Sequence, residues 1–137
     1  MATTTAASLA RLRKRLARVP IEVRAAAAAQ ALIEGNNLVI ALRGSSPKDD
    51  GTLRDSIRLE QGKYGDRFYV KAGGPTTTKP VRDGASATYD YSMASEYGTA
   101  HQPARAWFHP TYRVRRKSIR KRIEQAACQT ARKVCTR

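Results

Sequence analysis

Acidic residues are scarce in this chain of 137 residues. It contains 11 Asp and Glu against 26 Lys and Arg, which gives a formal net charge of +15. Metal-dependent hydrolysis needs several carboxylates that converge on the ion, whereas the few acids of this chain are scattered along it. The shortage therefore disfavours a metallonuclease. The positive charge predicts attraction to nucleic acid, an anionic membrane or an acidic protein surface, with a merely solvated basic surface as the alternative.

Cysteine and histidine are also scarce, with two of each. Cys128 and Cys135 lie seven apart in a segment expected to be helical, so their Cα atoms would be about 10.5 Å apart, too far for a disulfide. Two thiols without clustered histidines or carboxylates do not make a zinc site, and neither His101 nor His109 has a nucleophile motif around it. We predict no catalytic residue, metal or cofactor, and expect both cysteines to be small buried or interface side chains.

Long apolar runs are absent as well. No stretch of the sequence approaches the roughly 20 residues that cross a bilayer, and the first ten residues lack the apolar centre of a secretory signal. We therefore expect a protein that acts without a membrane, in the cytoplasm or in an assembly formed there. The length is that of one domain with a modest core.

An amphipathic helix is predicted over residues 6–19. Its apolar side chains recur at spacings of three and four along one face, and they are Leu9, Leu12, Leu16 and Val19. The opposite face is basic and includes the candidate polyanion contacts Arg11 and Arg15. Packing against its own domain or a neighbouring subunit is the favoured use. A membrane-surface helix is less favoured because the stripe has no Trp or Phe, and a phosphate-facing helix is the third alternative.

A second, alanine-rich helix is expected to follow. Pro20 suits its first turn, where the missing N–H costs nothing, and the helix should end near Arg43-Gly44. Together these two helices make up an N-terminal part over residues 1–43.

A small antiparallel sheet is expected over residues 52–98. Leu53, Ile57 and Leu59 alternate with polar residues, as in a half-buried strand. The segment 61–66 contains two glycines and is typical of a hairpin connection.

Two more strands complete the predicted sheet. Phe68, Val70 and Ala72 follow the hairpin connection with the same alternation. Tyr89, Tyr91 and Met93 also recur at every second position, and Gly98 is expected to end that strand with a sharp turn.

Residues 73–86 form an insertion between the last two predicted strands. The segment has two prolines, three glycines and almost nothing apolar, and a structureless stretch of this length is usually functional or disordered. We expect a mobile hairpin arm between these two strands that contacts a neighbouring chain. The candidate interface residues are Gly73, Gly74, Pro75, Lys79 and Arg82, together with the aromatic residues Tyr97, Trp107 and Phe108, for which a place in the core is the alternative.

A long C-terminal helix is predicted over residues 111–135. Ile119, Ile123 and Val134 belong to an apolar stripe at helical spacing. The candidate contacts with DNA or an acidic partner fill its far side: Arg113, Arg116, Lys117, Arg120 and Lys121. Like charges four apart destabilise a free helix by a few tenths of a kcal/mol per pair, and a polyanion is the simplest compensation. For any single arginine, a solvated position is the default.

Three short motifs occur in order along the chain. Residues 47–57 (Pro-Lys-Asp-Asp-Gly-Thr-Leu-Arg-Asp-Ser-Ile) match Pro-x-x-Thr-Gly-x-Leu-x-x-Ser-Ile, with Asp50 in place of the threonine. Residues 91–99 (Tyr-Ser-Met-Ala-Ser-Glu-Tyr-Gly-Thr) match Tyr-Ala-x-x-Val-Glu-Phe-Gly-Thr, and residues 105–111 match Arg-Pro-Phe-Leu-Arg-Pro-Ala more loosely. With this layout of helices and strands, the chain resembles the neck, or tail-completion, proteins of tailed bacteriophages, often called minor tail components.

The resemblance implies an α+β fold in a single domain over residues 1–137. A small antiparallel sheet of three or four strands with a long loop arm would pack against N-terminal helices and a long C-terminal helix. It also implies a structural protein of the virion, not an enzyme. Such proteins form a ring, here expected to be a hexamer, between the head-side connector or stopper and the tail-tube or tail-terminator protein, and duplex DNA passes through it.

Assembly of such a ring would take place in the host cytoplasm. Six copies at +15 would sum to about +90, which favours duplex DNA through counterion release. The alternative function is that of a nonspecific basic nucleic-acid-binding protein. A peripheral membrane binder that uses residues 9–19 is the remote third.

Overall fold

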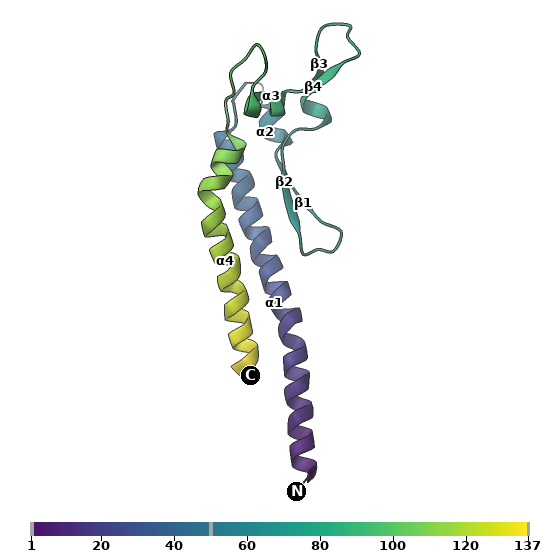
Figure 1. Ribbon diagram of the computed structural model, residues 1–137, viewed down its shortest axis with the longest axis vertical. Helices are drawn as coiled ribbons and strands as arrows, with labels where there is room; N and C mark the ends of the chain where they lie inside the picture. Colours follow the sequence, from purple (N-terminus) through teal and green to yellow (C-terminus); the bar gives the residue numbers. More distant parts are fainter. Residues whose placement is uncertain (1, 50, 137) are drawn as a thin grey trace.

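The computed structural model describes residues 2–49 and 51–136, without the side chains of residues 2–6 and 15. The fold is α+β, as expected. Two long helices, α1 (Ala2–Ser45) and α4 (Phe108–Thr136), lie side by side, and the short elements gather around one end of the pair (Figure 1). In chain order these are α2 (Thr52–Ser56), β1 (Arg58–Gln61), β2 (Phe68–Lys71), the 3-10 helix η1 (Pro75–Thr77), β3 (Thr78–Pro80), β4 (Thr88–Asp90) and α3 (Tyr91–Tyr97).

The two long helices run antiparallel in a register that two contacts define. Thr111 Oγ1 donates a hydrogen bond to Ser45 Oγ at 3.0 Å, and Arg122 Nη1 lies 3.0 Å from Glu34 Oε2. From Thr111 to Arg122 the sequence of α4 covers 11 positions, and from Ser45 back to Glu34 the sequence of α1 also covers 11. Extrapolated along both helices, the register places the end of α4 about level with residue 20 of α1. The earlier part of α1 therefore extends past α4, as Figure 1 shows.

Pro20 lies inside α1, so the predicted division of residues 1–43 into two helices is wrong. An interior proline removes one backbone hydrogen bond and crowds the preceding turn. The helix continues because the other backbone hydrogen bonds remain possible and the alanines of 25–29 have strong helix propensity. Its end at Ser45 confirms the expected stop near Arg43-Gly44. We call the part of α1 before Pro20, residues 2–19, the overhang.

The hydrophobic core lies at the end of the helix pair where the short elements gather. Leu42 and Ile57 are fully buried. The other buried members of the cluster are Leu38, Val39, Leu53 and Trp107. α2 thus contributes to the core together with the last turns of α1, and the segment before α4 adds the tryptophan.

The strands form two separate antiparallel pairs, β1–β2 and β3–β4, and not the predicted single sheet. The β1–β2 hairpin confirms the second strand and the turn over 61–66, with Leu59 opposite Val70. The strand predicted from Leu53 is wrong in its first half, where α2 occurs instead. Leu53 and Ile57 are four residues apart, a spacing that fits one turn of helix as well as alternation in a strand.

The strand predicted through Tyr91 and Met93 is also wrong beyond Asp90, because α3 begins there. The Asp90 carboxylate accepts a hydrogen bond from Ser92 N at 2.9 Å, which is the pattern of a helix N-cap. Met93 consequently lies outside the core, 61% exposed. Gly98 does make the expected turn, with φ +79°, although it ends a helix and not a strand.

The C-terminal helix confirms the prediction for 111–135 and begins slightly earlier, at Phe108. Val134 of the apolar stripe is buried, and Ile119 and Ile123 are half-buried. Cys128 and Cys135 are exposed, which excludes burial within the described chain and leaves the interface alternative as a prediction. At 100° per residue both fall on the side of the helix that carries the lysines 117 and 121, away from the stripe.

By length and composition alone, the helix over Ala7–Ser45 could cross a membrane. This differs from the expectation that no segment does. α4 packs along part of this helix, and its Glu34 is buried and bound to Arg122, but most of the apolar stretch is not buried within the described chain.

Candidate functional site

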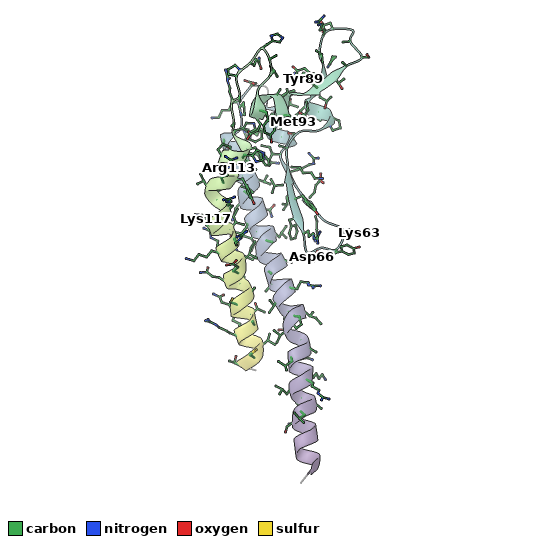
Figure 2. All side chains as sticks on the ribbon, viewed as in Figure 1. Lys63, Asp66, Tyr89, Met93, Arg113 and Lys117 are labelled. Carbon is green, nitrogen blue, oxygen red and sulfur yellow. The ribbon has the colours of Figure 1, made fainter. Side chains whose placement is uncertain are left out.

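α4 presents one continuous basic face. The predicted contacts on this helix are all exposed and fall within about 140° of its circumference; they are Arg113, Arg116, Lys117, Arg120 and Lys121. Figure 2 labels two of them, Arg113 and Lys117, on α4. Within the described residues none of the five has a carboxylate within ion-pair distance. Their mutual repulsion is therefore not offset by an ion pair in the part of the chain that the structure describes.

The basic face adjoins the apolar stripe more closely than the sequence predicts. A hollow of about 730 Å³ is lined by Tyr112, Arg116, Lys117, Ile119, Arg120, Lys121, Ile123 and Glu124. A ligand seated there would meet cationic groups and half-buried aliphatic side chains together. Such a mixture suits a protein surface with carboxylates as well as it suits a phosphate backbone.

The other two predicted polyanion contacts lie elsewhere. Arg11 is exposed on the overhang, and the side chain of Arg15 lies outside the described part of the chain. The overhang extends beyond the C-terminal end of α4 (Figure 1), whereas Arg113 lies near the N-terminal end of α4 (Figure 2). The two basic groups that the sequence predicts are therefore not brought together in one chain.

Glu96 holds the start of α4. Its Oε2 accepts hydrogen bonds from the backbone N–H groups of Trp107 at 2.7 Å and Phe108 at 2.9 Å, and its Oε1 accepts one from His109 at 3.0 Å. Burial by itself raises the pKa of Glu96, but these three hydrogen bonds outweigh it and the pKa lies below its ordinary value. The carboxylate also complements the positive end of the helix. α3 therefore positions the first turn of the basic helix.

Asp90 fixes the base of the predicted arm. Its Oδ1 accepts hydrogen bonds from Thr77 Oγ1 at 2.7 Å and Ser92 N at 2.9 Å, and its Oδ2 accepts one from Gly74 N at 3.2 Å. Burial opposes ionisation here too, yet the hydrogen bonds keep the pKa of Asp90 below its ordinary value. Thr77 is fully buried as a result.

The segment 73–86 is therefore anchored at its base, and its second half belongs to the antiparallel β3–β4 ribbon, which agrees with the predicted hairpin arm; its mobility and its contact with a neighbouring chain stay predictions. Gly73 is buried with φ +86°, and a Cβ there would collide with Ser92 Oγ and Asp90 Oδ2. Lys79 pairs with Tyr89 in the β3–β4 ladder. The ribbon itself projects from the body (Figure 1), and Lys79 in β3 and Arg82 in its turn are both exposed.

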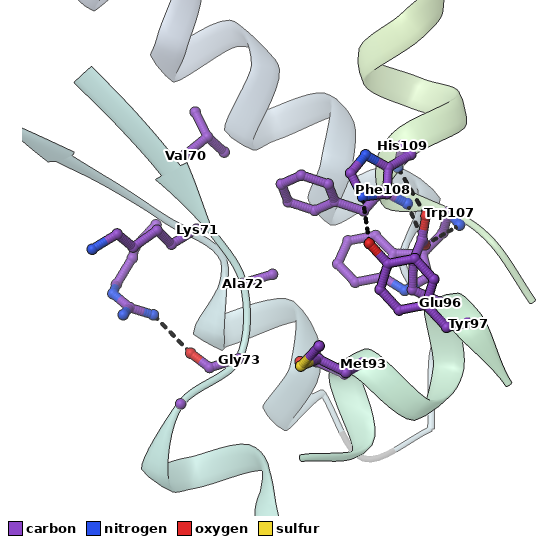
Figure 3. Close-up of a pocket in the computed structure, with 13 residues that line it drawn as sticks. Val70, Lys71, Ala72, Gly73, Met93, Glu96, Tyr97, Trp107, Phe108 and His109 are labelled. Carbon is purple, nitrogen blue, oxygen red and sulfur yellow. Dashed lines mark hydrogen bonds between the residues drawn. The ribbon is translucent and has the colours of Figure 1, made fainter. Parts of the chain in front are cut away.

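A cleft of about 400 Å³ lies between the end of β2, α3 and the start of α4 (Figure 3). Its apolar lining is Val70, Ala72, Met93, Trp107 and Phe108. Arg58 Nη1 donates to Gly73 O at 2.8 Å on one side, and Tyr97 OH lies 2.8 Å from His109 Nε2 on the other. The indole Nε1 of Trp107 is buried without a hydrogen-bond partner in the described part of the chain.

The predicted interface residues thus separate into two groups. Trp107 is core and Phe108 is half-buried, which follows the alternative for these rings, whereas Tyr97 is 64% exposed. Sequence reasoning missed Glu96 and Asp90. An Asp at position 90 is compatible with the N-cap of a helix, and this could have predicted α3. The alternation of Tyr89, Tyr91 and Met93 instead led to the prediction of a strand.

The described residues contain no cluster of three or more His, Cys, Asp or Glu side chains able to hold a metal ion. The two carboxylates with shifted pKa values in the interior, Asp90 and Glu96, are both stabilised as anions by backbone donors. This is the arrangement of capping groups, whereas a general acid at neutral pH needs a raised pKa. Asp90 and Glu96 therefore act as anionic hydrogen-bond acceptors that brace the elements around the cleft and the start of α4.

No protein-family model, curated protein or solved structure matches this chain.

Proposed function

We propose that this protein is a structural component of a phage neck, in which copies of the chain form a ring between the head connector and the tail tube and border the DNA passage. The observation that carries the proposal is the exposed basic face of α4, whose five cations lack counter-charges within the described chain. Duplex DNA, or an acidic neighbour, supplies those charges and releases condensed counterions.

The motif order supports the same proposal. Glu96 belongs to the motif over 91–99, and its three hydrogen bonds go to residues of the motif over 105–111. The two motifs thus form one joint, and that joint sets the direction in which α4 leaves the core. Because the contact between the two motifs sets the orientation of the basic helix, the two motifs are expected to occur together in a protein that uses this helix.

Ring formation needs a contact between two different surfaces of neighbouring copies. The β3–β4 ribbon, with Lys79 and Arg82 exposed, is the proposed donor surface, and the cleft beside Met93 and Tyr97 is the proposed acceptor. Both surfaces lie at the end of the molecule where the short elements gather (Figure 1). In this proposal the ring is a hexamer, it carries out no catalysis, it uses no cofactor or membrane, and it resides in the virion after assembly in the host cytoplasm.

Immunogold labelling of tailed particles from a host that carries this gene tests the proposal. We expect the label at the head–tail junction, and we expect deletion of the gene to yield separate heads and tails. Particles that lack the chain and remain whole would contradict the neck assignment.

A monomeric, nonspecific nucleic-acid-binding protein is the second candidate, because the basic face of α4 needs no neighbouring subunit to attract DNA. It predicts salt-dependent duplex binding by the monomer and particle assembly that is unaffected by deletion. Deletion of the gene therefore distinguishes the candidates, because only the neck assignment expects separate heads and tails.

A further inference from the structure

The overhang of α1 carries an apolar stripe that the described chain leaves uncovered. Leu9 and Leu12 are each 50% exposed, and Leu16 is 56% exposed. Figure 1 shows this part of the helix alone beyond the end of α4. A short helical stretch without tertiary packing is marginal in water, so the overhang gains stability when a partner covers the stripe.

The stripe continues the side of α1 that α4 covers. At 100° per residue, the leucines at 9, 12 and 16 lie within about 40° of Glu34 around the helix axis. Glu34 is buried and bound to Arg122 of α4. After Pro20 this side of α1 is therefore covered by α4, whereas before Pro20 no helix of the described chain covers it. A helix placed end to end with α4 would cover the exposed leucines.

The spacing of the stripe suits a helix more than a membrane. Leu9, Leu12, Leu16 and Val19 are separated by three, four and three residues, as are the a and d positions of a heptad. Such a stripe is a narrow seam that one partner helix fills. Helices that lie in a membrane interface have a broader apolar face, commonly with an aromatic anchor, and the overhang contains no aromatic residue.

Charge selects the kind of helix. The overhang has five basic residues and no acidic residue: Arg11, Arg13, Lys14, Arg15 and Arg18. Arg13 directly follows a d position, which places it at the edge of the seam where coiled coils form interhelical ion pairs. A second overhang, or α4 of a second copy, would bring basic residues against basic residues. An acidic helix is the complement.

We propose that the overhang is a docking site for an acidic amphipathic helix of a partner protein. Leucines of the overhang and apolar side chains of the partner form the seam, and Arg13 pairs with a flanking carboxylate. The inference rests on the overhang alone, so it stands or falls independently of the proposed neck function.

A labelled synthetic helix provides the test. The probe is a fluorescent peptide about three heptads long, with Ile and Leu at a and d and Glu at e and g; a second peptide carries Lys at e and g. Each is titrated against the full chain and followed by fluorescence anisotropy at physiological ionic strength. We expect the Glu peptide to bind and the Lys peptide not to bind.

Variants locate the contact. Leu12→Asp with Leu16→Asp should weaken binding of the Glu peptide about tenfold or more, because charged groups enter an apolar seam. The matched control is Ile33→Asp with Ile40→Asp, on an exposed part of the same helix outside the overhang, 52% and 67% exposed; it should change affinity less than about twofold. Arg13→Glu should weaken binding more than Arg11→Glu, which lies on the far side of the overhang. All these positions are exposed, so folding is retained.

Four outcomes would overturn the proposal. The Glu peptide does not bind, or it binds the leucine variant as well as the parent. Alternatively, the parent binds vesicles with phosphatidylglycerol through the leucines in preference to the peptide, which makes the overhang a membrane helix. Finally, leucine-dependent self-association in sedimentation would assign the stripe to a second copy of the chain.

Discussion

Arg122 of α4 binds a carboxylate that the fold has almost removed from solvent. Its Nη1 lies 3.0 Å from Oε2 of Glu34, whose side chain is 4% exposed, whereas the Arg122 side chain is 56% exposed. Gln30 Nε2 donates a second hydrogen bond to Glu34 Oε1 at 2.9 Å. The pair joins the two long helices about midway along α4, and it helps to fix the register that leaves the overhang uncovered.

Arg122→Ala should therefore lower the free energy of unfolding by about 1–2 kcal/mol, because it leaves the Glu34 carboxylate buried with only a neutral donor. Arg120→Ala is the matched control. It removes an exposed cation that has no ion-pair partner in the described chain, and it should cost less than about 0.5 kcal/mol. Urea unfolding of both variants measures the difference, and equal costs would show that the cross-helix pair contributes nothing.

Glu96 should make stability depend on acid pH. Its folded pKa lies below the ordinary 4.5 because the hydrogen bonds from Trp107, Phe108 and His109 outweigh the effect of burial. A depressed carboxyl pKa contributes stability that is present above the unfolded value and is lost as pH falls through the folded value. Asp90, lowered from 3.8, acts in the same direction over a lower range.

Glu96→Gln should cost about 2 kcal/mol near neutral pH, since an amide presents one acceptor and one donor to three backbone N–H groups. It should also flatten the loss of stability as pH falls below about 4.5. Glu124→Gln, an exposed acid on α4, should retain the parent's profile. Thermal unfolding across this pH range is the measurement, and an unchanged profile in Glu96→Gln would exclude the capping role.

The basic face of α4 should determine the salt dependence of DNA binding. Arg116→Glu with Arg120→Glu should leave the chain folded, because exposed charges contribute little to stability. It should reduce the slope of log K against log salt by about 2, roughly one per lost phosphate contact. Lys63→Glu with Arg67→Glu in the β1–β2 turn makes the same charge change on another surface and should have a smaller effect on the slope. If both pairs act alike, only net charge matters.

The stripe of α4 should respond to charge according to burial. Ile123 is half-buried, so Ile123→Asp should destabilise the chain by about 2 kcal/mol or more. Val114 lies on the same helix but is 82% exposed, and Val114→Asp should be tolerated. Circular dichroism melts of the two variants test the orientation of α4, and the reverse order of effects would mean that the helix faces the other way.

Limited trypsin digestion should cut the β3–β4 ribbon at Arg82 before it cuts elsewhere within residues 73–86. Arg82 is exposed in the turn, where its carbonyl accepts a hydrogen bond from Ala85 N at 3.0 Å. Lys79 is paired in β3 and precedes Pro80, a bond that trypsin disfavours. Mass spectrometry of the first fragments identifies the site. Rapid cleavage of the segment in an Asp90→Ala variant would show that the Asp90 contacts hold the ribbon.

The sequence by itself determined the long C-terminal helix, the helical character of residues 6–43, the β1–β2 hairpin and the basic character of the molecule. Each follows from a local pattern. The stripe of Ile119, Ile123 and Val134 repeats at the helical period, and 61–66 separates two alternating runs with two glycines. Net charge needs no fold at all. The motif segments also came from the sequence, although their structural roles did not.

Only the tertiary structure decided what the ambiguous segments became. Leu53 and Ile57 fit a strand or a helix by spacing, and the core selected α2 because both side chains are buried there. The alternating aromatic residues after Asp90 form the helix α3, and not a strand, because Asp90 caps that helix. Hydrogen bonds from Thr77 and Gly74, which are distant along the chain, hold the Asp90 carboxylate in place. Sequence periodicity shows which face of an element is apolar. Where the spacing fits both a helix and a strand, long-range packing and hydrogen bonds determine which one forms.

The same limit applies to the two surfaces of functional interest. Glu96 accepts hydrogen bonds from backbone N–H groups more than ten residues away, and the sequence around Glu96 does not indicate these donors. The leucines of the overhang belong to an apolar stripe in the sequence, and a stripe predicts a cover. The register between Glu34 and Arg122 places the end of the described α4 about level with residue 20 of α1, so the described chain does not supply this cover. The sequence thus determined that the overhang has an apolar face, and only the packing of the two long helices decided that this face lies beyond the end of the described α4.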